Sequence, residues 1–449
     1  MFGYSPSEVK SVAVYLVLYA NCTSYNNWMF IYPFLGSYLH QFNPAISMSF
    51  MFSCYIWMFV GLSIGNWLFV ETIKRLGFIR SIQAAGPFYL LNGVMYYAFS
   101  SRLMVAFNSL VTGVLLSFVT LSCLMLFNLN NKQTSAELYG TASSGYSFGS
   151  FIWVSVISWI LNPQNLLMEE TFDEKGKIEH FFPKVVADRF PLFAWICGII
   201  TCLCLMILPM FLEQPKGYGG SWFGETQPVS ERKKSIEQEL QEMRASVISV
   251  ESRPGEQPLI IGKFDEVKTI TSRAFVGLFI LTYARSTGVT YYIDNYKYFS
   301  YFILHDEDLA KKVFVWGSFF AITSRFVSGK FSNHFGFKKG TFILLIVNIT
   351  VDLCFLFFRE NVGFFIFLIQ VARTSYSFNL LFNGMSLFAL YPVLQAAKLM
   401  KYFELYWLVA LVHITIFNSL SEEGSYNGIL GSFVLLDVIA IYVYYKFLD

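Results

Sequence analysis

Charged residues are scarce in this sequence. Aspartate, glutamate, lysine and arginine together make up 14% of the 449 residues, while 55% of the residues are hydrophobic. A soluble globular domain carries roughly 25% charged residues. Apolar runs of about 20 residues, each near the length that crosses about 30 Å of hydrocarbon, recur from Ser11 to Phe447. The scarcity of charge therefore argues against a soluble protein and predicts that the lipid bilayer is the solvent of the chain.

Cysteine is missing from the polar loops. All seven cysteines lie inside apolar stretches, which excludes a framework of loop disulfides and favours small, buried hydrophobic residues. The opening MFGYSPSEVK lacks a basic region followed by a cleavage site, so we expect an internal targeting signal. The formal net charge of +2 predicts no nucleic-acid partner.

Motifs for nucleotide and metal chemistry are also missing. No Gly-x-x-x-x-Gly-Lys-Ser/Thr phosphate loop occurs, which excludes ATP-driven pumping by this chain alone. No Cys-x-x-Cys stands in a loop and the five histidines are scattered, so we expect no metal, no cofactor and no enzymatic activity. The enzyme alternative is an intramembrane acyltransferase built on His413, which needs a second polar residue within reach.

The apolar runs divide into twelve predicted transmembrane helices. Six lie near 11–36, 46–70, 82–100, 103–127, 137–161 and 190–212, and six near 269–292, 310–331, 340–358, 362–388, 402–420 and 427–446. The segment from 181 to 190 is too short to span and is expected to be a loop or surface helix. We predict an all-α polytopic membrane protein with an N-terminal six-helix bundle over 1–212, a polar linker over 213–268 and a C-terminal six-helix bundle over 269–449.

The linker is the only long charged region, and its core from Ser230 to Val250 favours an amphipathic helix. An even number of spans puts both termini and the linker on one side of the membrane. The short loops on that side are rich in Lys and Arg, which predicts the cytoplasmic side or its matrix equivalent. The plasma membrane and the mitochondrial inner membrane both stay open as locations.

Two turns at equivalent places in the two halves carry the most informative pattern. The turn after the second span contains Lys74, Arg75 and Gly77, and the turn after the eighth contains Gly329, Asn333, Gly336, Lys338 and Lys339. Gly336 allows a tight helix reversal, and the lysines anchor the turn at the basic face.

The second copy resembles the Gly-x-x-x-Asp-Arg-x-Gly-x-Arg/Lys loop of the major facilitator superfamily, and the first is a degenerate version. Six spans, a polar linker and six spans fit that superfamily along the whole chain. The resemblance implies two pseudo-symmetric bundles, the major facilitator fold. The acidic residue of the motif is Lys74 in the first copy and Asn333 in the second.

The stretch from Thr323 to Gly329 is similar to the eighth helix of the oxalate/formate antiporter and monocarboxylate transporter branch, where an Arg stands four residues before the loop Gly. Arg325 matches that position. The fifth span, with Gly140, Gly145 and Gly149, resembles the small-residue pattern of the same relatives. Such glycines let helices approach closely.

Three arginines fall inside predicted helices of the C-terminal half: Arg285, Arg325 and Arg373. An Arg at the centre of a membrane helix costs roughly 2.5 to 3.5 kcal/mol on insertion scales, so it normally faces a cavity or a partner. Its planar donors suit a carboxylate. The three arginines therefore favour an anionic substrate, although pairing with Asp352 or Asp437 as packing is the structural alternative.

His413, Asn27 and Tyr32 complete the predicted substrate site. His413 is the only titratable ring of the eleventh span and a candidate for a proton-linked group, although a hydrogen-bonded core histidine is the common alternative. Asn27 and Tyr32 on the first span could line a cavity or cement helix pairs.

The sequence thus predicts a secondary active transporter that moves a small organic anion, a monocarboxylate or dicarboxylate, by alternating access. The alternative is a transport-inactive accessory subunit with the same fold in a larger membrane complex, with other membrane subunits as partners. Three substitutions favour this alternative: Lys74 replaces the loop acid, Ala321 stands where relatives have the acidic partner of the Arg, and the eleventh span lacks a Lys.

Overall fold

The structure is a computed structural model of the chain. It describes residues 5–26, 28–130, 135–164, 166, 168–172, 178–213, 266–294, 307–358, 361–420 and 427–447. The predicted amphipathic helix of the linker, from Ser230 to Val250, lies outside these residues, as does Asn27.

The N-terminal half crosses the molecule six times. Its elements are α1 (Pro6–Asn26), α2 (Trp28–His40), α3 (Met48–Leu76), α4 (Phe78–Ala98), α5 (Arg102–Asn130), α6 (Ser135–Leu161), β1 (Glu169–Phe172), β2 (Ile178–Phe181), α7 (Lys184–Ala187), α8 (Phe190–Ile207) and the 3-10 helix η1 (Leu208–Phe211). Helices α1 and α2 together make the first pass.

The C-terminal half also crosses six times. Its elements are α10 (Glu266–Ile270), α11 (Arg273–Asp294), α13 (Glu307–Phe358), α14 (Val362–Leu390), α15 (Val393–Phe403), α16 (Leu405–Leu420) and α17 (Asn427–Phe447). Helix α13 holds two passes, because its backbone leaves the helical conformation at Gly336. Helices α15 and α16 together make one pass.

Seven helical stretches of the described chain are long and apolar enough to cross a bilayer by themselves: Ser53–Leu76, Arg102–Leu129, Ser135–Leu161, Lys184–Phe211, Val315–Phe358, Val362–Leu390 and Gly428–Lys446. The other passes carry polar side chains that point inward. On α11, for example, Thr282, Arg285 and Thr290 are all buried. Buried polar residues lower the mean hydropathy of a pass without exposing polarity to lipid, and the chain is an integral multi-pass membrane protein.

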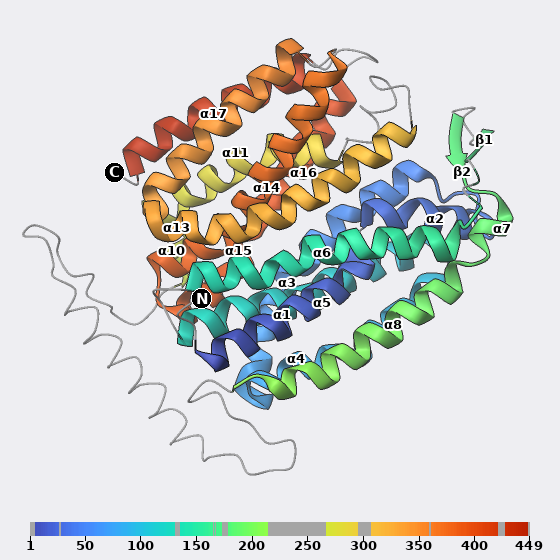
Figure 1. The fold of residues 1–449 in the computed structure, drawn as a ribbon, viewed down its shortest axis with the longest axis horizontal. Helices are drawn as coiled ribbons and strands as arrows, with labels where there is room; N and C mark the ends of the chain where they lie inside the picture. Colours follow the sequence, from blue (N-terminus) through green and yellow to red (C-terminus); the bar gives the residue numbers. More distant parts are fainter. Residues whose placement is uncertain are drawn as a thin grey trace, which may run out of the picture.

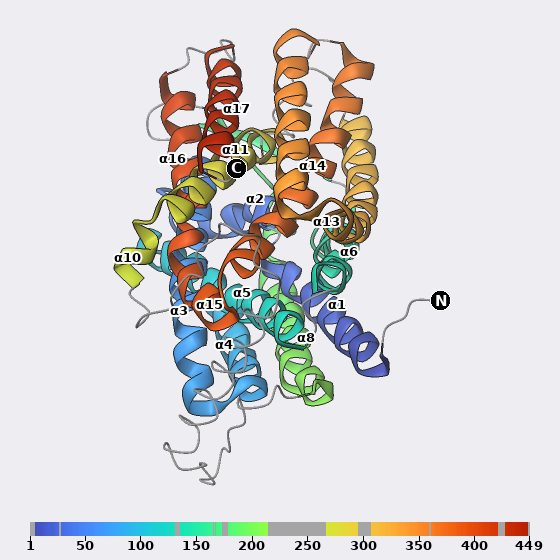
Figure 2. The same cartoon turned by 90° about the vertical axis from the view of Figure 1, so that its left-hand side faces the viewer.

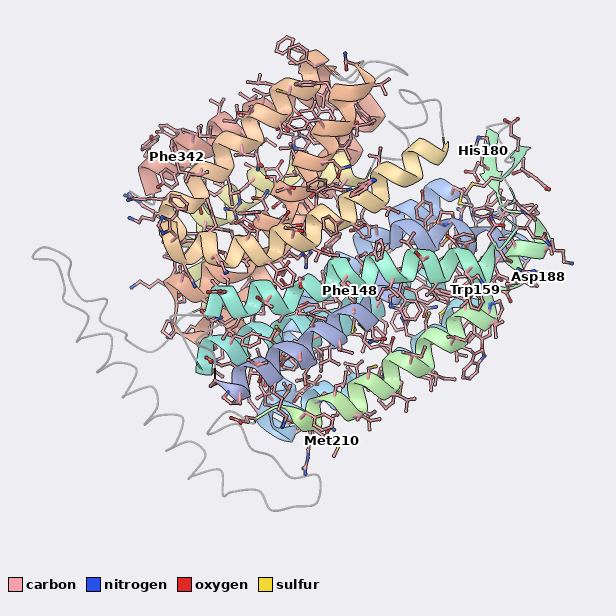
Figure 3. The ribbon with its side chains drawn as sticks, in the orientation of Figure 1. Phe148, Trp159, His180, Asp188, Met210 and Phe342 are labelled. Atoms are coloured by element: carbon pink, nitrogen blue, oxygen red, sulfur yellow. The ribbon has the colours of Figure 1, made fainter. Side chains whose placement is uncertain are left out.

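Large apolar side chains cover the outside of the bundle (Figure 3), as expected where lipid replaces water. Phe148 and Trp159 of α6 are 43% and 76% exposed, and Met210 beside α8 is 70% exposed. Polar groups gather instead at the ends of the passes, as at His180 and Asp188 beyond the end of α6.

The two halves lie against each other, with α6 and α13 side by side along the boundary (Figure 1). The turn at Gly77, the kink at Gly336, the start of α1 and the end of α17 lie at one end of the bundle, called here the linker end because α10 leads into α11 there. The opposite end carries β1 and β2, and is called the hairpin end. Figure 2, turned by 90°, shows α3 and α15 meeting at a second boundary between the halves.

The structure adds elements to the predicted spans. The segment from 181 to 190 holds the end of strand β2, the four-residue helix α7 and the start of α8. Strands β1 and β2 pair antiparallel, with Glu169 opposite Phe181. The hairpin is docked on the N-terminal half, since the rings of Phe181 and His40 stack with centroids 3.9 Å apart and the Phe182 N–H donates to the Ser37 Oγ over 2.8 Å.

Candidate functional site at the boundary between the halves

Two facing glycines bring α6 and α13 into close contact near the linker end. A Cβ on Gly140 would lie 2.7 Å from the Arg325 carbonyl oxygen, and a Cβ on Gly329 would lie 2.6 Å from the Glu137 Cα. Real Cβ contacts are longer than this, and both obstacles are backbone or helix-rooted atoms that yield little. Only glycine therefore lets the two halves approach this closely here.

A second contact joins α3 to α15 and α16. The rings of Phe59 and Trp407 stack with centroids 4.9 Å apart, and the Ser63 hydroxyl donates a hydrogen bond to the Lys401 carbonyl. These contacts, with those of Gly140 and Gly329, hold the halves together on the linker side of the molecule.

Arg325 lies at the first of these boundaries. Its side chain is buried, and its Nη1 donates to the Ser143 carbonyl of α6 over 2.5 Å. The guanidinium carbon lies 5.2 Å from the centre of the Tyr146 ring, within cation–π range. The Nε has no hydrogen-bond partner among the described residues. Arg325 therefore joins the C-terminal half to the N-terminal half and keeps one donor available.

Four tyrosines surround this arginine. Electrostatic interaction links the guanidinium to the phenol groups of Tyr19 on α1, Tyr139 and Tyr146 on α6, and Tyr376 on α14. Tyr139 and Tyr146 are two turns apart and so share one face of α6. We call these five residues the arginine–tyrosine centre. Aromatic faces and hydroxyl groups around one cation are suited to a small anion with an apolar body.

The sequence interpretation missed the tyrosines. The chain contains 27 tyrosines, so residue type alone did not distinguish these four. The seven-residue spacing of Tyr139 and Tyr146, next to the glycines of the same helix, is the signal that could have found them.

Arg285 lies inside the C-terminal half. It is 1% exposed, and its guanidinium donates to the Thr341 hydroxyl over 3.4 Å and to the Asn383 side-chain oxygen. The Arg285 carbonyl accepts hydrogen bonds from the side chains of Asn348 and Asn379, over 2.7 and 3.0 Å. These contacts connect α11 to α13 and α14, so the described partners of Arg285 belong to its own half.

Arg373 also packs within the C-terminal half. A Cβ on Gly317 of α13 would lie 2.4 Å from the Arg373 Cδ and 2.7 Å from its Nη1. The arginine side chain therefore lies flat against the Gly317 backbone. These contacts place Arg285 and Arg373 apart from the α6 contacts of Arg325, so the structure does not bring the three arginines onto one described surface.

The remaining predicted substrate residues are also dispersed. His413 accepts or donates on both ring nitrogens, with the Tyr283 hydroxyl 2.6 Å from Nδ1 and the Ser432 hydroxyl 3.0 Å from Nε2. Those partners lie on α11 and α17. Tyr32 on α2 is half-buried and packs against the main hydrophobic core. Asn27 is outside the described residues.

The signature turns adopt one geometry in both halves. Gly77, between α3 and α4, has φ 81° and ψ 171°, and Gly336 within α13 has φ 71° and ψ 171°. Both values lie in a region that residues other than glycine rarely enter. The basic and polar residues of the turns are exposed: Lys74, Arg75, Asn333, Lys338 and Lys339. Lys74 pairs with Glu71, one turn earlier on α3.

A charged pocket of about 270 Å³ opens beside the first signature turn. Its lining residues come from α3, α10 and α15: Trp67, Val70, Glu71, Lys74, Glu266, Lys398 and Lys401. Lys401 Nζ lies 2.9 Å from the Glu266 carboxylate, which also accepts a hydrogen bond from the Tyr402 hydroxyl over 3.2 Å. The hydrogen bond from Lys401 is the main reason that the pKa of Glu266 is lowered. The start of the C-terminal half is thereby fastened to α15.

No group of three or more His, Cys, Asp or Glu side chains able to hold a metal ion occurs in the described part of the chain. The chemistry that the described boundary offers is therefore ionic, hydrogen-bonding and aromatic.

Comparisons with known proteins point to one architecture. The sequence matches no protein-family profile and no curated protein. The structure of the human organic anion transporter MFSD10 matches with a TM-score of 0.62 at 14% identity, over 98% of this chain and 100% of that one. The major facilitator superfamily proton:xylose symporter XylE, bound to 6-bromo-6-deoxy-D-glucose, matches with a TM-score of 0.71 at 13% identity, over 99% and 97%.

The E. coli fucose:proton symporter FucP matches with a TM-score of 0.61 at 12% identity, over 98% of both chains. Identities this low show the fold alone. The matches cover nearly the whole of each chain, so this protein has the major facilitator fold, twelve transmembrane helices in two six-helix bundles, as the spans and turns predicted.

Proposed function

We propose that this protein is a secondary active transporter of a small organic anion, a monocarboxylate or dicarboxylate, and that it works by alternating access. In this mechanism the two six-helix bundles rock around a site near the middle of the membrane. The fold supports secondary transport in general, and the substrate class rests on the residues at the boundary between the bundles.

The observation that carries the proposal is the position of Arg325. Its guanidinium contacts the Ser143 carbonyl and the Tyr146 ring of the opposite half, and its Nε has no described partner. A carboxylate could take up this donor and replace the carbonyl contact, and a charge-assisted hydrogen bond is roughly twice as strong as a neutral one. Substrate binding would thereby alter the contact that joins the halves.

Arg285 and Arg373 have a supporting role in this proposal. Both guanidinium groups are buried in the C-terminal half, where they add positive potential without touching the substrate. His413 is held by two hydroxyl groups, so we assign it to positioning α16 against α11 and α17.

The similar fold of MFSD10, described as an organic anion transporter, agrees with the proposed substrate class. XylE and FucP, described as proton-linked sugar symporters, make an uncharged sugar the rival substrate. The four tyrosine rings around Arg325 would suit a sugar face too, but a sugar would leave the buried cation without a countercharge.

A transport-inactive accessory subunit is the second candidate function. The bond from Arg325 to the Ser143 carbonyl favours it, because the chain partly satisfies its own cation. In that case Arg325 would fasten the halves permanently, and other membrane subunits would be the partners.

We also propose that the linker end faces the cytoplasm or the mitochondrial matrix. Exposed Lys74, Arg75, Lys338 and Lys339 gather in the signature turns at that end, and such a bias toward basic residues sets the orientation of polytopic proteins.

Counterflow into liposomes that contain the purified protein tests the proposal. Labelled oxalate, formate, lactate and pyruvate should be compared with xylose and fucose. Exchange of at least one carboxylate and of neither sugar supports the anion transporter. Exchange of a sugar alone overturns the substrate class, and folded protein that moves none of the six favours the accessory subunit.

A further inference from the structure

Two carboxyl groups lie buried together in the C-terminal half. Asp352 on α13 is 3% exposed and Asp437 on α17 is 1% exposed, and the two groups interact with each other. Neither belongs to the arginine–tyrosine centre. Carboxylates inside a membrane bundle are costly and normally have a function.

A glycine makes room for this pair on α11. A Cβ on Gly288 would lie 2.9 Å from both carboxylate oxygens of Asp352. Arg285, Gly288 and Tyr292 recur at spacings of three and four residues and so share one face of α11. The carboxyl pair therefore lies against a helix face with a cation at one end and a phenol at the other.

The hydrogen bonding of this cluster is incomplete. Neither side-chain oxygen of Asp437 has a hydrogen-bond partner among the described residues, and the fully buried hydroxyl of Tyr292, which neighbours Asp352, has none either. No described Lys, Arg or His nitrogen lies within 4.0 Å of either carboxyl. The Tyr292 hydroxyl is thus an unsatisfied polar group directed at the carboxyl pair, and buried groups of this kind normally have a ligand.

We propose that Asp352 and Asp437 form a proton-binding site and that its proton is the coupling ion of the transport proposed above, on which this inference rests. Two adjacent carboxylates without ion pairs cannot both be ionised in a low-dielectric interior, so they share a proton. With one proton, the pair carries a single negative charge opposite the single positive charge of Arg285. Release of that proton leaves the cluster with a net negative charge.

The charged and titratable groups that face this site come from three helices. Arg285, Tyr291 and Tyr292 belong to α11, Asp352 to α13 and Asp437 to α17. Arg285 is the only described cation among them, and it interacts with Asp437. His413 on α16 is held by Tyr283 and Ser432.

A chain of contacts connects the site to the boundary between the halves. Arg285 donates to the Asn383 side-chain oxygen, and Asn383 donates to the Tyr406 hydroxyl over 3.0 Å. Tyr406 packs on Trp407 with ring centroids 5.0 Å apart, and Trp407 stacks on Phe59 of the N-terminal half. A change of charge at the carboxyl pair pulls on Arg285, and this chain passes the displacement to the contact between α3 and α16.

Infrared spectroscopy of the purified protein tests the proton site without any transport. At about pH 7, exposed Asp and Glu are ionised, because their reference pKa values are near 4. The expected spectrum still contains the carbonyl stretch of a protonated carboxyl group. The double variant Asp352→Asn/Asp437→Asn should lose that band, and Asp188→Asn, which changes an exposed aspartate at the hairpin end, should keep it.

Three results would overturn the proton site. A wild-type spectrum without a protonated carboxyl at about pH 7 is sufficient even if the double variant does not fold. A band retained in the folded double variant, or lost in Glu404→Gln, would assign the proton to another group. A band without transport keeps the proton site and rejects the proposed function, whereas transport without a band rejects the proton site alone.

Discussion

Gly77 and Gly336 adopt the same backbone conformation at equivalent turns of the two halves. Their ψ angles are both 171° and their φ angles are 81° and 71°. Each turn reverses the chain between two long helices at the linker end. Other sequence similarity between the halves is slight, so the shared conformation shows that the turn geometry is kept where the surrounding side chains differ.

Replacing Gly336 by alanine should destabilise the protein by about 1–3 kcal/mol, because a side chain is strained at this φ and ψ. An added Cβ at Gly336 would meet no atom within 4 Å, so the effect comes from the backbone alone. Gly431→Ala on α17 is a matched control, since its Cβ also meets nothing and alanine favours a helix. Unfolding of both variants in detergent measures the difference. Equal stability of the two variants would show that the Gly336 turn is not strained.

Gly329→Ala should weaken the closed contact at the linker end. The new Cβ would lie 2.6 Å from the Glu137 Cα across the boundary between α13 and α6, so the halves must separate there. Pulsed electron paramagnetic resonance between spin labels at positions 74 and 398, which line the linker-end pocket from opposite halves, should show a longer distance.

The control for Gly329→Ala is Gly145→Ala. Its Cβ would lie 2.1 Å from the Leu16 carbonyl oxygen, a contact within the N-terminal half. This variant should lose stability but leave the distance between positions 74 and 398 unchanged. If Gly329→Ala leaves that distance unchanged as well, the glycine contact does not hold the linker end closed.

The ion pair between Glu266 and Lys401 should contribute a small, pH-dependent stability. The pKa of Glu266 is lowered, chiefly by the hydrogen bond from Lys401, so the contribution is present above the unfolded pKa and is lost as pH falls through the folded one. Because the Glu266 side chain is 33% exposed, the pair should be worth no more than about 1 kcal/mol.

Glu266→Gln tests this pair. The variant should be slightly less stable than wild type at neutral pH and indistinguishable from it well below the ordinary Glu pKa of 4.5. Glu71→Gln, which changes another carboxylate of the same pocket, keeps the Lys401 pair and serves as control. A stability difference for Glu266→Gln that persists in acid would assign the effect to packing.

Much of the fold could be predicted because membrane crossing depends on local sequence. Apolar length marks the spans, and a glycine between two such runs marks a turn, as at Gly336. The β hairpin was missed because its strands have four residues each and owe their stability to rings of the N-terminal half such as His40. Helix α15 was missed because Lys398 and Lys401 interrupt its apolar pattern.

The candidate site was harder to predict because it depends on which way each polar residue faces. Arg285, Arg325 and Arg373 look alike as arginines inside apolar helices. Only packing shows that Arg325 contacts the opposite half while the described contacts of Arg285 and Arg373 lie within their own. The structural alternative for His413, a hydrogen-bonded core histidine, describes its observed contacts.

The most direct test of the account is carboxylate counterflow by Arg325→Gln in liposomes. Lys339→Gln, which removes an exposed charge from the second signature turn, is the matched control. The account predicts that Arg325→Gln abolishes exchange of the carboxylate that wild-type protein moves, while Lys339→Gln retains it. Exchange at the wild-type rate by folded Arg325→Gln protein would contradict the assignment of Arg325 to the anion site.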